Sequence, residues 1–186
     1  NFTKGVKDDR WALDVANMHF NSTLKTNLLP ATSVAYFDFA NEGIFVPRGS
    51  LVGVKDALIH NFSSTSACKI VENSIECDCT LIDKFPKLEI AFHNGDKKEW
   101  VSIAGKYLIS KVGKVCKTAF YEGVATQDVM IGRVIAEDHI LVFNQEESKI
   151  SLGKEYSTSI ESHKISEDVM GTVIGVGLFF IIASII

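Results

Sequence analysis

The sequence has little proline and no run of basic residues interleaved with aromatic ones. Only 3 of its 186 residues are proline, while 46% are hydrophobic and 23% are charged. A chain of this length and composition buries a core and is globular rather than disordered. The formal net charge is -4. Because a nucleic-acid interface needs clustered lysine and arginine, we expect no nucleic-acid partner.

The motifs of nucleophilic and phosphate chemistry are also missing. The chain has no Gly-x-Ser-x-Gly sequence, and its five histidines have no evident triad partners. It has no glycine-rich phosphate loop, because Gly171, Gly175 and Gly177 lie in an apolar C-terminal stretch. We therefore expect no cofactor. The chain begins without a signal peptide, so we expect a mature fragment or a piece of a longer precursor.

An apolar run without a charged residue occupies positions 169–186. At about 1.5 Å per residue, a helix over this run just spans a hydrocarbon core of about 30 Å. A buried core helix, or a cleaved lipid-anchor signal after the small residues 157–159, are the alternatives. We favour a transmembrane helix, preceded by a juxtamembrane linker at 161–168 and a folded domain at 1–160.

Two further patterns place the folded domain on the extracellular or lumenal side of a membrane. The linker carries little positive charge, which is typical of a non-cytoplasmic flank. Three N-glycosylation sequons begin at Asn1, Asn21 and Asn61, which indicates the secretory pathway. Within the apolar run, Gly171 and Gly175 form a small-xxx-small pattern, which predicts close packing against another membrane helix.

The chain has an even number of cysteines, which are Cys68, Cys77, Cys79 and Cys116. In an oxidising compartment this predicts two disulfides, and three pairings are open. The close pair at 77–79 also allows a metal site with His60 or His93. That spacing is not the usual zinc pattern and no second cysteine pair follows, so we expect no metal.

Hydrophobic periodicity predicts an all-β domain with one substantial helix. Strands are expected at 11–15, 28–38, 88–92, 100–109, 129–131, 140–143 and 149–153. Asn94-Gly95 predicts a tight hairpin after the third of these strands. Ser50 is expected to cap a helix over 51–59, whose apolar residues recur at helical spacing.

The segment at 34–47, VAYFDFANEGIFVP, is similar to the second active-site loop of pepsin-like aspartic proteases, in which an Asp follows two apolar residues and a proline ends the stretch. Further matches occur, in the family's order, at 79–88, 92–95, 107–109, 130–133 and 142–144. Together they cover about residues 10–153. The resemblance implies the C-terminal lobe of a pepsin-like fold.

The resemblance also implies roles for single residues. Asp38 stands at the catalytic position, where it would form half of a pair of carboxylates that share one proton. The second Asp would come from another lobe or chain. Cys116 stands where the disulfide partner of Cys79 is expected, which leaves Cys68 to pair with Cys77.

The loop departs from the family's pattern beside the catalytic position. Phe39 replaces a threonine whose hydroxyl ties the two active-site loops together, and Ala40 replaces a glycine. Asn41 replaces a second hydroxyl residue. Arg133 and Asn144 stand where the family often has Asp. Since small errors of position near the reacting groups are costly, these departures argue against efficient catalysis.

We therefore expect a membrane-anchored module that resembles an aspartic protease, lacks catalysis, and binds a partner lobe or another subunit. A lone lobe would expose the face that normally packs on its partner, which is unfavourable, so we expect a protein partner. One alternative is an active, membrane-anchored aspartic endopeptidase that uses Asp38 with an Asp from a second lobe. Another is a purely structural surface protein.

Overall fold

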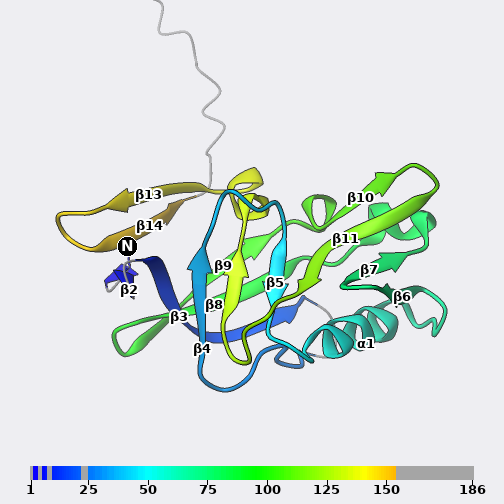
Figure 1. Ribbon diagram of the computed structural model, residues 1–186, viewed down its shortest axis with the longest axis horizontal. Coiled ribbons are helices and arrows are strands. Elements are labelled where there is room, and N and C mark those ends of the chain that lie inside the picture. The colour runs from blue at the N-terminus through cyan, green and yellow to red at the C-terminus, as the bar shows by residue number, and fades with distance from the viewer. Residues whose placement is uncertain (1, 4–5, 8–9, 22–24, 154–186) are drawn as a thin grey trace, which may run out of the picture. The chain divides into compact units, whose positions relative to one another are not determined.

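The computed structural model describes residues 2–3, 6–7, 10–21 and 25–153. This part of the chain consists mostly of β-strands, with one α-helix and three short 3-10 helices (Figure 1). None of its helices is both long and apolar enough to cross a membrane. The predicted membrane helix at 169–186, the linker at 161–168, the glycine pair Gly171 and Gly175, and the sequon at Asn1 all lie outside the described residues.

The elements follow one another closely along the chain. The first half contains β1 (Phe2–Thr3), β2 (Val6–Lys7), β3 (Arg10–Phe20), β4 (Ser33–Phe37), β5 (Ile44–Val46), α1 (Leu51–Phe62), β6 (Cys68–Val71), β7 (Ser74–Cys77) and η1 (Cys79–Lys84). The second half contains β8 (Leu88–Asn94), β9 (Lys97–Ile103), η2 (Gly105–Tyr107), β10 (Ile109–Val112), β11 (Val115–Glu122), β12 (Val129–Ile131), η3 (Arg133–Glu137), β13 (Ile140–Asn144) and β14 (Lys149–Gly153).

The main sheet has the strand order β6-β7-β11-β5-β12-β4-β3-β8-β9, and β10 and β2 pair with β11 and β3 beside this path. Its central feature is the position of β12, which lies between β4 and β5 although these two are consecutive in sequence. β12 runs parallel to β4 and antiparallel to β5. The segment that joins β4 to β5 must therefore pass over the end of β12.

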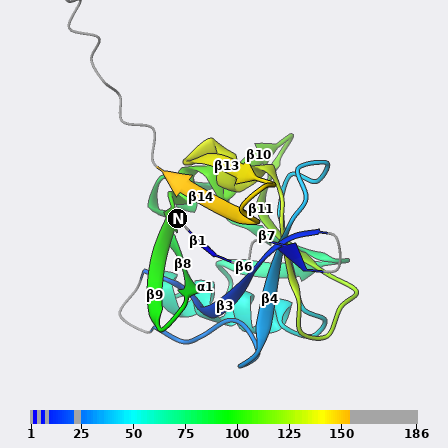
Figure 2. The same cartoon turned by 90° about the vertical axis from the view of Figure 1, so that its left-hand side faces the viewer.

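A smaller sheet has the order β1-β14-β13, so that β13 forms one of its edges. In both views the hairpin of β13 and β14 lies on the side of the molecule opposite α1 (Figure 1) (Figure 2). The two faces of β13 differ. Leu141 and Phe143 pack against the main core, while Ile140 and Val142 are 54% and 55% exposed. Within the described residues, β13 pairs only with β14, so the other edge of this strand is open and two of its exposed side chains are apolar.

Helix α1 contributes to the same core as the main sheet. Leu51, Val54 and Leu58 are buried within it, and each buried Leu or Val contributes roughly 1.5–3 kcal/mol relative to an exposed one. The prediction that the Ser50 side chain caps the helix is wrong, because this side chain makes no capping hydrogen bond. The helix also extends beyond the predicted Ile59 and ends at Phe62, since Ser63 is the first residue with a left-handed backbone.

Two strand boundaries differ from the sequence prediction for local reasons. The strand expected at 28–38 begins only at Ser33, because a turn precedes it in which the Ser33 hydroxyl donates to the Pro30 carbonyl at 3.0 Å. The predicted hairpin joins β8 to β9, but its loop is Gly95-Asp96 rather than Asn94-Gly95. Asn94 still pairs with Lys97, and Gly95 takes the positive φ of 62° that the turn requires.

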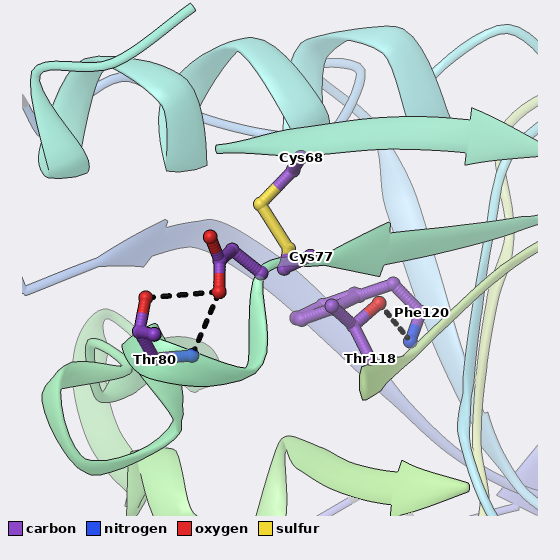
Figure 3. The surroundings of a disulfide bond; sticks show 6 residues. Cys68, Cys77, Thr80, Thr118 and Phe120 are labelled. Atoms are coloured by element: carbon purple, nitrogen blue, oxygen red, sulfur yellow. Dashed lines mark hydrogen bonds between the residues drawn. A yellow bond between two sulfur atoms is a disulfide. The ribbon is translucent and has the colours of Figure 1, made fainter. Parts of the chain in front are cut away.

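Two disulfides crosslink the end of the main sheet. One joins Cys68 to Cys77 and the other joins Cys79 to Cys116. These are the two pairs that the resemblance implies. Figure 3 shows the first bond linking β6 to the neighbouring strand β7. Because Cys77 and Cys79 are both in disulfides, their sulfurs are not available as thiolate ligands for a metal.

Candidate functional site

Asp38 lies directly after β4, at the start of the loop that passes over the end of β12. Backbone hydrogen bonds hold this loop to the chain on both sides of Gly132. The Asp38 N–H donates to the Ile131 carbonyl at 3.0 Å, and the Arg133 N–H donates to the Asn41 carbonyl at 2.8 Å. The Gly132 N–H donates to a loop carbonyl, that of Gly43, at 2.8 Å. The loop is therefore a fixed part of the sheet.

The Asp38 carboxylate is engaged by donors of its own loop. Its Oδ1 accepts the backbone N–H of Ala40 at 3.0 Å, and its Oδ2 accepts the side-chain amide of Asn41 at 2.9 Å. The Asn41 amide nitrogen also lies 3.9 Å from the sulfur of Met130 on β12. Asn41 thus supplies a hydrogen-bond donor at the position where the resemblance implies a hydroxyl. Both oxygens of the half-buried carboxylate close a turn.

Phe39 is directed toward the body of the domain. Its ring packs edge-on against Phe143 of β13, with 5.8 Å between the ring centroids. Phe37 and Trp11 contact the same ring at 6.2 and 5.0 Å. These four side chains form an aromatic cluster that joins the loop to the small sheet. The Phe39 ring therefore anchors the loop to the small sheet.

Close packing of the loop on the β12 end requires glycine at position 132. A Cβ built there would lie 2.3 Å from the Asn41 carbonyl oxygen and 2.7 Å from the Gly43 carbonyl oxygen. Gly43 is similarly enclosed, because its Cβ would lie 2.4 Å from the Tyr121 ring. The sequence pattern included Gly132 only as part of a motif. Its steric role becomes evident once the loop and the β12 end are brought together.

The remaining departures from the family's pattern have local partners. The Arg133 guanidinium forms an ion pair with Glu42 of the loop. Since these side chains are 56% and 82% exposed, the pair contributes only about 0–1 kcal/mol. Asn144 lies at the end of β13, where its Oδ1 accepts the Glu147 N–H at 3.1 Å. These two residues organise turns and do not contact Asp38 through any hydrogen bond described for this part of the chain.

A row of apolar side chains crosses the outer face of the main sheet beside the loop. Successive members lie directly opposite one another on β11, β5, β12, β4 and β3. They are Tyr121, Phe45, Met130, Tyr36 and Ala12. We call this set the outer row. Tyr36 and Ala12 are buried, while Tyr121, Phe45 and Met130 are half-buried, so the row opens toward β5 and β11.

The outer row was not predicted, although part of its signal was present in the sequence. With the period of two that strands have, Val34 and Tyr36 on β4 and Met130 on β12 face away from the main core. The pairing that places these residues side by side is non-local. Phe45 and Tyr121 stack with 5.1 Å between their ring centroids and 25° between their planes, although they lie far apart in sequence. Sequence periodicity alone does not contain this register.

The other candidate positions lie away from the loop or have no role in it. Asn21 is exposed at the end of β3, and Asn61 is half-buried in the last turn of α1.

Asp78 caps η1, and its carboxylate accepts the backbone N–H and the hydroxyl of Thr80. These hydrogen bonds, the backbone one first, lower the pKa of Asp78 below its ordinary value. The described residues contain no cluster of three or more His, Cys, Asp or Glu side chains suited to a metal ion.

Comparisons with known proteins relate the chain to a fold and to no sequence family. No family model matches it, and no curated protein matches it. Among solved structures, it is similar to basic 7S globulin from soybean, with a TM-score of 0.64 and 12% sequence identity. The match covers 84% of this chain and 41% of that chain, so the chain spans less than half the length of the structure it matches. The relation is therefore a distant one of fold.

Proposed function

We propose that this chain is a non-catalytic module of the aspartic-protease type, which binds a second β-built lobe through the exposed β13 edge of its small sheet. The observation that carries the proposal is the engagement of the carboxylate. Both of its oxygens accept hydrogen bonds from residues 40 and 41 of the same loop. Each oxygen has a second lone pair, and these two bonds fix the carboxylate within its own loop. Here the group serves to close a turn.

The packing of Phe39 supports the same conclusion. Its ring lies against Phe143, so position 39 offers no hydroxyl to connect this loop with that of a second lobe. The turn is stable without such a connection. A loop that is complete on its own is suited to a scaffold whose role is recognition, because it does not depend on a partner for its shape.

The partner is inferred from the exposed edge of the small sheet. Ile140 and Val142 lie on edge strand β13 and are more than half exposed. An apolar, unpaired strand edge favours the addition of another strand. The soybean globulin extends well beyond the part that this chain matches. We therefore infer that the occupant of this edge is a lobe of similar β architecture.

We also infer that the C-terminal run at 169–186, which carries no charged residue, anchors the module in a membrane with the folded domain on the extracellular or lumenal side.

An assay of peptide hydrolysis at acidic pH tests the loss of catalysis. The chain and its Asp38→Asn variant should show the same background rate on a mixed peptide substrate, with and without a pepstatin-type inhibitor. Inhibitable hydrolysis that disappears in Asp38→Asn would replace the proposal by the second candidate, an active endopeptidase. One observation favours that candidate: the carboxylate keeps the position after β4 that the family's catalytic Asp occupies.

Sedimentation velocity tests the edge as a binding surface. Without a partner, the exposed β13 edge should drive concentration-dependent self-association. The double variant Ile140→Lys/Val142→Lys should remain monomeric, because the added charges oppose strand addition. Val52→Lys is the matched control, since Val52 is 50% exposed on α1. Equal association of both variants would remove β13 from the proposal.

A further inference from the structure

All four cysteine sulfurs gather where β6, β7 and β11 lie side by side. Cys77 on β7 is directly opposite Cys68 on β6 and directly opposite Cys116 on β11. Residues that face one another across a ladder project from the same face of a sheet. Cys68, Cys77 and Cys116 therefore project from one face of the sheet, and Figure 3 shows the bond between the first two. Cys79, at the start of η1, is bonded to Cys116 and so reaches the same face. A bond between Cys77 and Cys116 would require no change in strand register.

A cavity of about 330 Å³ opens beside the two disulfides, and one cysteine of each disulfide, Cys77 and Cys79, lines it. Its volume is within the range of about 300–1,000 Å³ that is usual for small-molecule sites. Cys77, Cys68 and Cys116 are buried, whereas Cys79 is half-exposed. Since exchange depends on access to the attacked sulfur, we infer that an incoming thiolate attacks Cys79, which is the half-exposed member of the four.

Two lysines, Lys69 and Lys114, and two carboxylates, Glu76 and Asp78, line the cavity. Glu76 lies between two lysines, with 3.7 Å to Lys69 and 3.9 Å to Lys117. The Asp78 carboxylate accepts both hydrogen bonds of Thr80 on Oδ1 and stays ionised, so Lys114 is the lining cation left without an ion-pair partner among the residues that the structure describes. Its ammonium group is thus available to a ligand carboxylate and raises the local concentration of thiolate.

We propose that this cavity binds a small, carboxylate-bearing thiol, which forms a mixed disulfide with Cys79. The thiolate attacks Sγ of Cys79, the Cys79–Cys116 bond breaks, and its electron pair leaves on Cys116 as a thiolate. Cys116 then attacks Sγ of Cys77, which lies opposite it. The Cys68–Cys77 bond breaks, and Cys68 leaves as a thiolate that takes a proton from water. Two disulfide bonds exist before and after, and one ligand thiol is exchanged for one protein thiol.

Reduced glutathione is the probe for this reaction, and cysteamine, a cationic thiol, is the comparison. After brief incubation, free thiols are alkylated and the products are mapped by mass spectrometry without reduction. Cleavage before Asp78, combined with cleavage after lysine, separates Cys77 from Cys79. We expect glutathione on Cys79, the alkyl group on Cys68, and a crosslink between Cys77 and Cys116. Glutathione on Cys68 or Cys77 overturns the proposal, as does alkylated Cys116 beside an intact Cys68–Cys77 bond.

Two variants separate a built site from simple chemical reduction. Lys114→Glu should slow the reaction with glutathione several-fold and should not slow the reaction with cysteamine. Lys97→Glu, on the β8–β9 hairpin, is the matched control and should leave both rates unchanged. The double variant Cys68→Ser/Cys77→Ser should stop the reaction at its first step, with glutathione on Cys79 and alkylated Cys116. Equal effects of Lys114→Glu and Lys97→Glu would rule out recognition by the cavity.

Discussion

Two regions of the main sheet, the edge formed by β6, β7 and β11 and the Asp38 loop at the end of β12, are held together by different means. At the edge formed by β6, β7 and β11, two disulfides fix the chain covalently. At the Asp38 loop, hydrogen bonds and close backbone contact do the same work without a crosslink. The first arrangement tolerates many neighbouring side chains, since the bond itself supplies the constraint. The second arrangement depends on glycine at position 132, where a side chain would meet the loop backbone. The predictions below test this difference in order of decreasing effect.

Removal of a disulfide should have the largest effect, and the two bonds should differ. The Cys79–Cys116 bond closes a loop with a sequence separation of 37, and the Cys68–Cys77 bond one of 9. The chain-entropy relation gives about 4 kcal/mol of stabilisation for the longer loop and about 2.5 kcal/mol for the shorter one. Urea unfolding of Cys79→Ala/Cys116→Ala and Cys68→Ala/Cys77→Ala measures both. A greater loss from the shorter loop would mean that strain, rather than loop closure, dominates at this corner.

Gly132→Ala should be the most damaging single substitution at the other end of the comparison. The added Cβ would meet two backbone carbonyl oxygens of the loop, which cannot move aside as a flexible side chain would. We expect a loss of about 3 kcal/mol in the free energy of unfolding, typical of overpacking against rigid neighbours. Thermal or urea unfolding provides the measurement.

Gly53→Ala is the control for this substitution. A Cβ at Gly53, inside α1, would meet nothing within 4 Å, so alanine should stabilise the helix by about 0.5–1 kcal/mol. Opposite signs for the two glycine variants are expected. A neutral Gly132→Ala variant would show that the loop can separate from the β12 end, and the comparison between the two regions would lose its basis.

The loop carboxylate should contribute less than the glycine. In Asp38→Asn, the side-chain oxygen can still accept the Ala40 N–H, but an NH2 group then faces the donor amide of Asn41. Loss of this charge-assisted hydrogen bond should cost about 1–2 kcal/mol. Asp14→Asn is the control, because Asp14 is exposed on β3. Equal stability of the two variants would show that the carboxylate does not hold the turn.

Local sequence signals predicted the helices and strands better than the residues at which they begin and end. The hairpin of β8 and β9 was confirmed, yet its turn is displaced by one residue because Asn94 remains in the ladder. The start of α1 at Leu51 was confirmed, but its end depends on the backbone of Ser63, which no pattern of apolar residues records. The resemblance to pepsin-like proteases supplied what periodicity lacks, namely the order of the elements and the two cysteine pairs.

The candidate site was less accessible to prediction, since its important contacts are non-local. The sequence identified Asp38 and its unusual neighbours at 39–41. It did not show that Phe39 packs against Phe143. It also did not show that the loop packs closely against Gly132, at the end of β12. These facts follow from the insertion of β12 between β4 and β5. That insertion is a property of strand pairing and not of any single segment.

The smallest effect should come from Asp78, at the covalently fixed edge, and it should depend on pH. The backbone N–H and the hydroxyl of Thr80 lower the pKa of this carboxyl in the folded state. The ionised form is therefore favoured by folding, and its contribution is present above the unfolded pKa of about 3.9. It is lost as the pH falls through the lower, folded pKa. Because Asp78 is fully exposed, the effect should be small and should weaken with added salt. Unfolding of the chain and of Asp78→Asn between pH 6 and 2 should show a stability difference at pH 6 that disappears at the acidic end. A difference that grows toward low pH would have the wrong sign, and it would exclude the ionised carboxylate as the cap of η1.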